Sequence, residues 1–198
     1  MSEHIETSFV RGLVRPDRVH RDIYLDPAVF ELEMSTLWRN AWIYVGHESQ
    51  VPRPGDFFTA QIGREPVIMV RGTDAKVRVL PNRCAHKGTK LLSARQGKCQ
   101  AGLLRCPYHG WTYRLDGSLR SVPLKSGYDA RTQADALHGL PDYDAHNYRG
   151  FVFVRLASEG VGFHEFFGDS LSSIDNMVDR SPEGRLEVVG GALRYLHD

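Results

Sequence analysis

The chain is short of cysteine and has no long apolar run. It contains three cysteines among 198 residues, an odd and low number that argues against a disulfide scaffold and favours a reducing compartment. No uninterrupted apolar stretch approaches the roughly 20 residues that a membrane helix needs. The polar, acidic start at residues 1–7 is unlike a secretory signal peptide. These absences predict a cytoplasmic protein with no membrane partner.

Neither sign of charge dominates the sequence. The formal net charge is +1, with 25 Lys and Arg against 24 Asp and Glu, so the overall charge gives no reason to expect a nucleic-acid partner. The hydrophobic share of 41% and the charged share of 25% are ordinary for a globular protein. The length suits one domain, or one domain with extensions.

The N-terminal part predicts an arm followed by a helix. Residues 1–25 show no clear period and are expected to be extended. Asp26 and Pro27 supply an N-cap residue and a first-turn proline, and apolar residues follow at helical spacing. We therefore expect a helix from about Pro27 to Asn40, packed on a core, and assign residues 1–41 to an N-terminal arm and helix.

From residue 42 onward, short strands broken by turns are predicted. Strands are expected at residues 42–45, 57–62, 67–71, 77–80 and 148–156. The pair Asp116-Gly117 predicts a hairpin, and the polar residues 124–147 are expected to form a long surface loop. Many short strands with frequent turns indicate a small, mainly β domain over residues 42–156.

Residues 157–198 are expected to form a connector and the start of a further domain. Residues 163–178 carry apolar side chains at helical spacing and predict a second helix, and residues 186–196 predict a strand. A chain that stopped at such a strand would leave an unfinished apolar sheet edge. We therefore expect this sequence to be the N-terminal piece of a longer protein.

Two cysteines and two histidines, arranged in mixed pairs, are the most informative residues. Cys84 and His86 are spaced Cys-x-His, and Cys106 and His109 are spaced Cys-x-x-His. Each pair lies between predicted strands in a glycine-containing turn, where free backbone N–H groups can hydrogen-bond cluster sulfurs. Two thiolates and two imidazoles delivered in this way suit a [2Fe–2S] cluster in which histidines replace cysteines on one iron.

The residue pattern alone leaves other uses of these side chains open. A Cys₂His₂ set also suits tetrahedral Zn²⁺, although zinc sites usually pair Cys with Cys and His with His by spacing. A nucleophilic Cys–His pair would leave the second pair unexplained, and ordinary core or surface positions are disfavoured by two mixed pairs in turns. The third thiol, Cys99, has no His or Cys within three residues and is expected to be a free thiol near a turn.

Two local motifs surround the ligand pairs, Cys84-x-His86-Lys87-Gly88 and Cys106-Pro107-Tyr108-His109-Gly110-Trp111. They resemble the Rieske motif of ring-hydroxylating oxygenase α subunits, and the resemblance extends over most of the chain. It implies that Cys84 and Cys106 ligate one iron while His86 and His109 ligate the other. It also implies that residues 42–156 form a Rieske [2Fe–2S] domain of short antiparallel strands.

The resemblance separates two groups of Rieske proteins. Respiratory cytochrome bc-type proteins have an extra cysteine in each loop, forming a disulfide, and a serine after the His-Gly pair that donates to a cluster sulfur. Here Thr89 and Tyr108 occupy the cysteine positions and Trp111 the serine position. Because fewer hydrogen bonds would reach the cluster, we expect a midpoint potential of about −150 mV, at the lower end of the Rieske range. Tyr113 is expected to serve packing rather than redox control.

The resemblance implies electron transfer as the function. In the family, electrons pass from NAD(P)H through a reductase or ferredoxin to the cluster, and then to a mononuclear iron held by two His and one carboxylate. The signature Asp-x-x-His-x₄-His for that iron is not found, because Asp135 and His138 are followed by His146, which lies too far along. We therefore expect no catalytic residue here, His109 as the candidate electron exit, and the mononuclear Fe(II) in a missing domain.

Two rival interpretations stay open. A free-standing Rieske ferredoxin-type carrier would leave the helical arm and the tail beyond Leu156 unexplained, and a zinc-stabilised binding module would be colourless. For the leading interpretation, an aromatic ring-hydroxylating dioxygenase, the resemblance implies an α₃ homo-oligomer or an α₃β₃ assembly with a small subunit. The aromatic substrate is not specified by this part of the sequence.

Overall fold

The computed structural model describes residues 7–128 and 138–190, and three small antiparallel sheets dominate it. The central sheet has the order β6-β5-β4-β7, with β4 Asp56–Ile62, β5 Glu65–Arg71, β6 Val77–Pro81 and β7 Gln96–Lys98. The second has the order β11-β12-β3, with β3 Ile43–His47, β11 Asp144–Tyr148 and β12 Phe151–Arg155. The third has the order β10-β9-β8, with β8 Leu103–Arg105, β9 Thr112–Arg114 and β10 Leu119–Ser121. The prediction of a mainly β fold of short antiparallel strands is confirmed.

Strand β5 separates two hydrophobic cores. Its four central residues, Val67 to Val70, are all fully buried. Val67 and Met69 pack in the core shared with β3 and β12. Ile68 and Val70 pack in the core that contains both Cys84 and Cys106. Because side chains of a strand alternate between faces, a strand covered on both faces has an unbroken apolar sequence, and one of these faces supports the candidate site.

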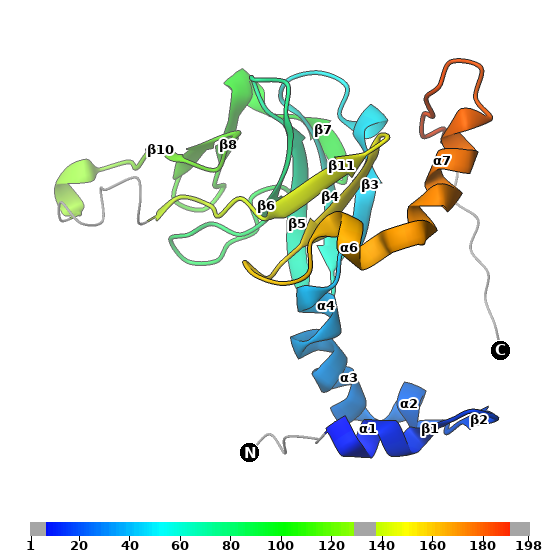
Figure 1. Cartoon of the computed structure of the whole chain (residues 1–198). Coiled ribbons are helices and arrows are strands. Elements are labelled where there is room, and N and C mark those ends of the chain that lie inside the picture. The colour runs from blue at the N-terminus through cyan, green and yellow to red at the C-terminus, as the bar shows by residue number, and fades with distance from the viewer. Residues whose placement is uncertain (1–6, 129–137, 191–198) are drawn as a thin grey trace.

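The N-terminal arm is mostly helical and extends away from the sheets (Figure 1). It consists of α1 Thr7–Leu13, the hairpin of β1 Val14–Arg15 and β2 Arg18–Val19, α2 Asp22–Leu25, α3 Pro27–Ser35 and α4 Leu37–Asn40. The extended arm expected at residues 1–25 is therefore wrong at residues 7–13 and 22–25, which are helical. The predicted helix does begin at Pro27, where the Asp26 carboxylate accepts from the Ala28 N–H at 2.8 Å.

The single helix expected up to Asn40 is interrupted at Thr36. The φ of Thr36 is −114°, outside the helical range, and its hydroxyl donates to the carbonyl oxygen of Leu32 at 2.6 Å. Such a bond from a threonine to the preceding turn competes with the helix ladder and bends the helix. The start of the helix is as predicted, but its packing on a core is only partly so, because Phe30 and Leu37 are exposed and Val29 is the buried residue of α3. The hydrogen bond that divides the helix at Thr36 is not visible in the apolar spacing.

The part that follows β10 differs from the sequence expectations in three places. Residues 144–147, expected within a loop, form edge strand β11 together with Tyr148, and the polar composition of this strand is typical of sheet edges. The helix expected at residues 163–178 is divided into α6 Phe163–Phe167 and α7 Leu171–Asp179 near Gly168, whose φ is +47°. Residues 186–190 of the expected strand form no strand, and residues 191–198 lie outside the described residues. None of the helices in the described ranges is long and apolar enough to cross a membrane.

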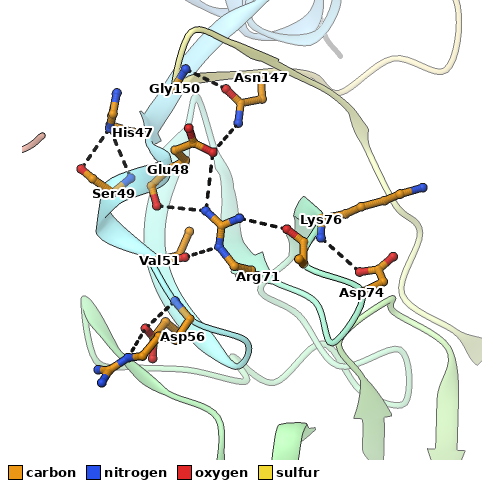
Figure 2. A network of polar contacts seen from close by, with 12 residues as sticks. His47, Glu48, Ser49, Val51, Asp56, Arg71, Asp74, Lys76, Asn147 and Gly150 are labelled. Atoms are coloured by element: carbon orange, nitrogen blue, oxygen red, sulfur yellow. Dashed lines mark hydrogen bonds and ion pairs between the residues drawn. The ribbon is translucent and has the colours of Figure 1, made fainter. Parts of the chain in front are cut away.

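A polar network fixes the segment between β3 and β4, which includes the 3-10 helix η1 Glu48–Gln50 (Figure 2). The Arg71 guanidinium of β5 donates to the carbonyl oxygen of Val51 at 2.5 Å and lies 3.5 Å from the Glu48 carboxylate. The same carboxylate accepts from the Asn147 side chain at 2.9 Å. His47 is buried beside this network, and burial lowers the pKa of its imidazole. These contacts join β5 to the β11–β12 hairpin.

Candidate metal centre

The two loops that carry the predicted ligands have the same backbone design. The first ligand loop, residues 84–89, follows β6, and the second, residues 106–111, is the tip of the β8–β9 hairpin. In each, the cysteine N–H donates to the carbonyl five residues later, and the glycine N–H donates to the cysteine carbonyl. The four bonds are Cys84 N to Thr89 O (2.9 Å), Gly88 N to Cys84 O (2.9 Å), Cys106 N to Trp111 O (2.7 Å) and Gly110 N to Cys106 O (3.1 Å).

Glycine is required at the same position of both loops. The φ of Gly88 is +70° and that of Gly110 is +71°, in the left-handed region that other residues adopt only at a cost. A side chain at Gly110 would also lie 3.2 Å from the Pro123 ring. Each glycine therefore lets its loop turn back so that its cysteine and histidine face the other loop.

The structure brings the two cysteines together and the two histidines together, although the sequence mixes them. Cys84 and Cys106 are both buried free thiols, and burial together with the neighbouring Cys106 raises the pKa of Cys84. The rings of His86 and His109 lie with their centroids 4.8 Å apart. The described side chains thus form two like pairs, and no three His, Cys, Asp or Glu among them gather around one point. Such an arrangement suits a two-metal centre with thiolates at one metal and imidazoles at the other.

His86 has a buried ring nitrogen that is free to bind a metal. Its Nδ1 atom is buried and has no hydrogen-bond partner among the described residues, and such buried unpaired atoms are rare in native proteins unless an ion or water completes them. Burial, with the nearby His109 and Lys87, lowers the pKa of its imidazole. A neutral imidazole with a free lone pair is the form that ligates metals. The residues present therefore fit an iron–sulfur cluster.

The two histidines differ in their access to solvent. His86 is half-buried, whereas His109 is exposed. The His109 ring stacks on the exposed ring of Tyr108, with centroids 3.7 Å apart and planes 29° apart. Because both cysteines are buried, His109 is the predicted ligand that a partner protein could approach most directly.

The Tyr113 hydroxyl contacts a predicted ligand directly. The Tyr113 side chain is fully buried, and its hydroxyl oxygen lies 3.1 Å from the sulfur of Cys84. That oxygen also accepts from the Ala85 N–H at 3.1 Å. If Cys84 is a thiolate, only the tyrosine hydroxyl can donate in the contact between them. Tyr113 therefore contacts a predicted ligand in addition to packing in the core, and a donor to a ligating sulfur would influence the redox potential.

We expect Tyr113→Phe to lower the midpoint potential of the reconstituted protein. The O–H donor stabilises the reduced, more negative centre, so its loss lowers the midpoint potential. A difference of about 1 kcal/mol corresponds to roughly 40 mV for one electron. A redox titration followed by EPR measures the shift. Tyr148→Phe removes a hydroxyl bonded to Asp175 instead and is the control that should leave the potential in place. Equal potentials for Tyr113→Phe and the unaltered chain would contradict the assignment.

Asn82 ties together the residues on either side of the first ligand loop. Its side chain is fully buried. The carboxamide oxygen accepts from the N–H groups of Leu91 and Leu92 at 3.1 and 2.9 Å, and the nitrogen donates to the carbonyl of Leu92 at 2.8 Å. The structure shows that Asn82 closes the base of the loop.

Asn82→Leu is expected to destabilise the protein by about 3 kcal/mol. The change leaves two backbone N–H groups and one carbonyl without their partner in the core, and each buried unsatisfied group costs about 1–3 kcal/mol. Urea unfolding of the two proteins measures the difference. The control Asn147→Ala removes an exposed amide that bonds the Glu48 carboxylate and should cost less. A loss below about 1 kcal/mol for Asn82→Leu would refute the role of this side chain.

The sequence also contains a segment rich in basic residues, which the near-zero net charge of the whole chain does not reveal. Residues 75–115 include both ligand loops and contain no Asp or Glu, but nine basic residues: Lys76, Arg78, Arg83, Lys87, Lys90, Arg95, Lys98, Arg105 and Arg114. Arg78 pairs with Asp74 and Arg83 with Glu65. Lys87 is exposed next to His86, and the Arg105 guanidinium lies beside Gly110. A local count of charge would have revealed this basic segment.

Other residues singled out from the sequence do not join the site. Asp135 lies outside the described residues. His138 packs edge-on against Trp111 at 5.8 Å, whereas His146 stacks on Phe163 at 3.9 Å, in the core near the C-terminal helices. Cys99 is a free thiol directly before the 3-10 turn η2 Gln100–Gly102, as expected, and burial raises its pKa to about 11.

Two matching loops with paired cysteines and paired histidines define a Rieske-type iron–sulfur domain. The Rieske [2Fe-2S] domain family matches residues 41–143, more than half of the chain. The chain is 35% identical over 207 residues to toluate 1,2-dioxygenase subunit alpha of Pseudomonas putida, with 100% of the chain and 45% of that protein covered. It is 37% identical over 195 residues to the anthranilate 1,2-dioxygenase large subunit of Acinetobacter baylyi, covering 95% of the chain and 41% of that protein.

Solved structures agree with these relatives. Naphthalene 1,2-dioxygenase from Rhodococcus sp. bound to indole superposes with a TM-score of 0.79 at 31% identity, covering 87% of this chain and 39% of that one. The chain belongs to the Rieske [2Fe–2S] domain family, as represented in aromatic ring-hydroxylating dioxygenase α subunits. It spans less than half the length of the relatives named here.

Proposed function

We propose that this chain is the electron-transfer part of an aromatic ring-hydroxylating dioxygenase α subunit. Cys84, Cys106, His86 and His109 would hold a [2Fe–2S] cluster, the cysteines on one iron and the histidines on the other. When bound, the cluster supplies reversible transfer of one electron. The observation that carries the proposal is the buried, unpartnered Nδ1 of His86 beside His109, across from two buried thiols.

The chain's own residues would shield the centre on one side and leave it open on the other. The buried cysteines and half-buried His86 keep water away from most of the site. The Tyr113 hydroxyl would donate to the Cys84 sulfur and adjust the potential. His109, exposed and stacked on Tyr108, would be the side on which electrons leave.

The longer protein implied by the relatives would contain the rest of the reaction. We propose residues 1–41 as an N-terminal arm, residues 42–156 as the Rieske domain and residues 157–198 as a connector to a catalytic domain. That domain would hold the mononuclear iron and the aromatic substrate. The relatives named as subunits of toluate and anthranilate dioxygenases support an assembly of several subunits, and we retain α₃ or α₃β₃ as the expectation.

The basic segment around the ligand loops favours an acidic electron donor, a reductase or ferredoxin. Opposite charges on two proteins accelerate their encounter, and salt screens this effect over about 10 Å at 0.1 M ionic strength. Lys87 is exposed in the first ligand loop and has no ion pair among the described residues. We therefore expect its charge to assist docking of the donor near the cluster.

Lys87→Glu is expected to slow reduction by the donor protein by about tenfold at low salt, and the difference should shrink as salt is added. Stopped-flow reduction at several ionic strengths measures the rate. Lys76→Glu is the matched control, because Lys76 lies directly before β6 whereas the ligand loop follows the other end of that strand. Equal slowing by both variants, or by neither, would count against docking at the ligand loops.

The test of the proposed function is a redox titration of the reconstituted chain. We expect uptake of one electron per cluster, with a midpoint of about −150 mV. A strongly positive midpoint would instead match the respiratory type, and a protein that takes up no electron would refute electron transfer altogether. A colourless protein with one zinc per chain would support the zinc-stabilised module.

A further inference from the structure

Trp111 belongs to the second ligand loop, but its side chain lies against the first. Its carbonyl oxygen accepts the N–H of Cys106 at 2.7 Å, which closes the second loop. Its indole ring is stacked on the imidazole of His86, with centroids 4.8 Å apart and planes only 4° apart. One residue therefore connects the backbone of one ligand loop to the predicted ligand of the other.

The indole of Trp111 is held in place on several sides. Its side chain is 1% exposed and belongs to the core under the ligand loops. Its ring nitrogen donates to the Tyr128 hydroxyl at 3.5 Å. The rings of Tyr128 and His138 meet it edge-on, each with a centroid distance of 5.8 Å. Because protein cores are close-packed, a ring enclosed in this way keeps its orientation.

The orientation of the indole determines that of His86. The torsion that rotates an imidazole about its stem is broad and weakly restricted by itself, so a neighbour must fix the ring plane. The offset-parallel stack on Trp111 does so. The ring of Tyr128 meets His86 nearly at right angles, at 6.2 Å and 78°. Rotation of His86 would break these contacts and move its buried Nδ1 atom.

We propose that Trp111 is a positioning residue that fixes the plane of the His86 imidazole, so that Nδ1 points into the metal centre. This inference rests on the proposed function, because it takes His86 to be a ligand. His109 does not share the enclosure, since it is exposed and stacks on an exposed Tyr108. Loss of the indole should therefore disturb one histidine ligand and leave the other as it is.

The test is pulsed EPR of the reduced, cluster-loaded chain, which reports the magnetic couplings of the two histidine nitrogens. In Trp111→Leu we expect one nitrogen coupling to broaden or disappear while the other is unchanged. Trp111→Phe should restore both sharp couplings, because a phenyl ring can also stack. The variant His86→Cys lacks the nitrogen coupling of His86. The coupling that changes in Trp111→Leu should be this same coupling.

Trp42→Leu is the matched control, because Trp42 is a similarly buried tryptophan in a different core, 5.4 Å from the Phe163 ring. Unchanged couplings in Trp111→Leu, or equal changes in both nitrogens, would overturn the inference. If Trp111→Leu binds no cluster while Trp42→Leu does, the inference is supported; loss in both overturns it. An unaltered chain without two histidine couplings would overturn the proposed function and this inference together.

Discussion

Cys84→Ala should abolish the iron–sulfur centre. The thiol is buried in the core next to Cys106, and a thiolate at this position would be one of only two on its iron. Alanine cannot ligate a metal, and the ligand loops contain no third cysteine that could replace Cys84. After reconstitution with iron and sulfide, we expect the variant to lack the red-brown colour and the EPR signal of the unaltered chain.

Cys99→Ala provides a matched control for this loss. Cys99 is also buried in the same core and is also a free thiol, so its removal creates a similar cavity without touching the predicted site. We expect this variant to bind a full cluster. If Cys84→Ala retained iron and sulfide, or if Cys99→Ala lost them equally, the predicted ligand set would be wrong.

His109→Cys should keep a cluster but strongly reduce electron transfer onward. Exchange of an imidazole for a thiolate adds negative charge to the centre. Because all-cysteine clusters have lower reduction potentials than clusters with two histidine ligands, the midpoint should fall by on the order of 100 mV. A lower midpoint makes the reduced cluster a stronger donor, so the slowing is expected from the path alone, because a cysteine is shorter than the exposed imidazole that it replaces. In an α subunit that contains this domain, single-turnover transfer to the mononuclear iron should therefore fall by about a hundredfold or more.

His86→Cys separates the effect of path from that of potential. It introduces the same thiolate and should lower the midpoint by a similar amount, but His86 is half-buried and enclosed by Trp111. We expect transfer in His86→Cys to slow much less than in His109→Cys. Equal rates in the two variants, or a normal rate in His109→Cys, would remove His109 from its role as the electron exit.

The main features of the fold could be predicted because they depend on local patterns. The strand of Val67 to Val70 has β-branched residues bounded by turns, and Asp26-Pro27 combines a cap with a helix start. The breaks at Thr36 and Gly168 could not be predicted from apolar spacing, since each depends on one local torsion angle. Strand β11 was missed because its polar residues suit a sheet edge as well as a loop.

The four candidate ligands could be proposed because both motifs lie within short stretches of sequence. Their sorting into like pairs could not, since it depends on how two loops meet in space. The contact of Tyr113 with Cys84 joins residues 29 positions apart, and that of Asn82 with Leu92 joins residues 10 positions apart. Such contacts depend on the register of strands, which alternation of side chains alone does not determine.

The most direct test of this account is the iron and acid-labile sulfide content of the reconstituted chain, measured together with the nitrogen couplings in its EPR spectrum. We expect about two iron and two sulfide per chain and couplings from two histidine nitrogens. One zinc per chain without sulfide, or an iron–sulfur cluster without histidine nitrogen couplings, would contradict it.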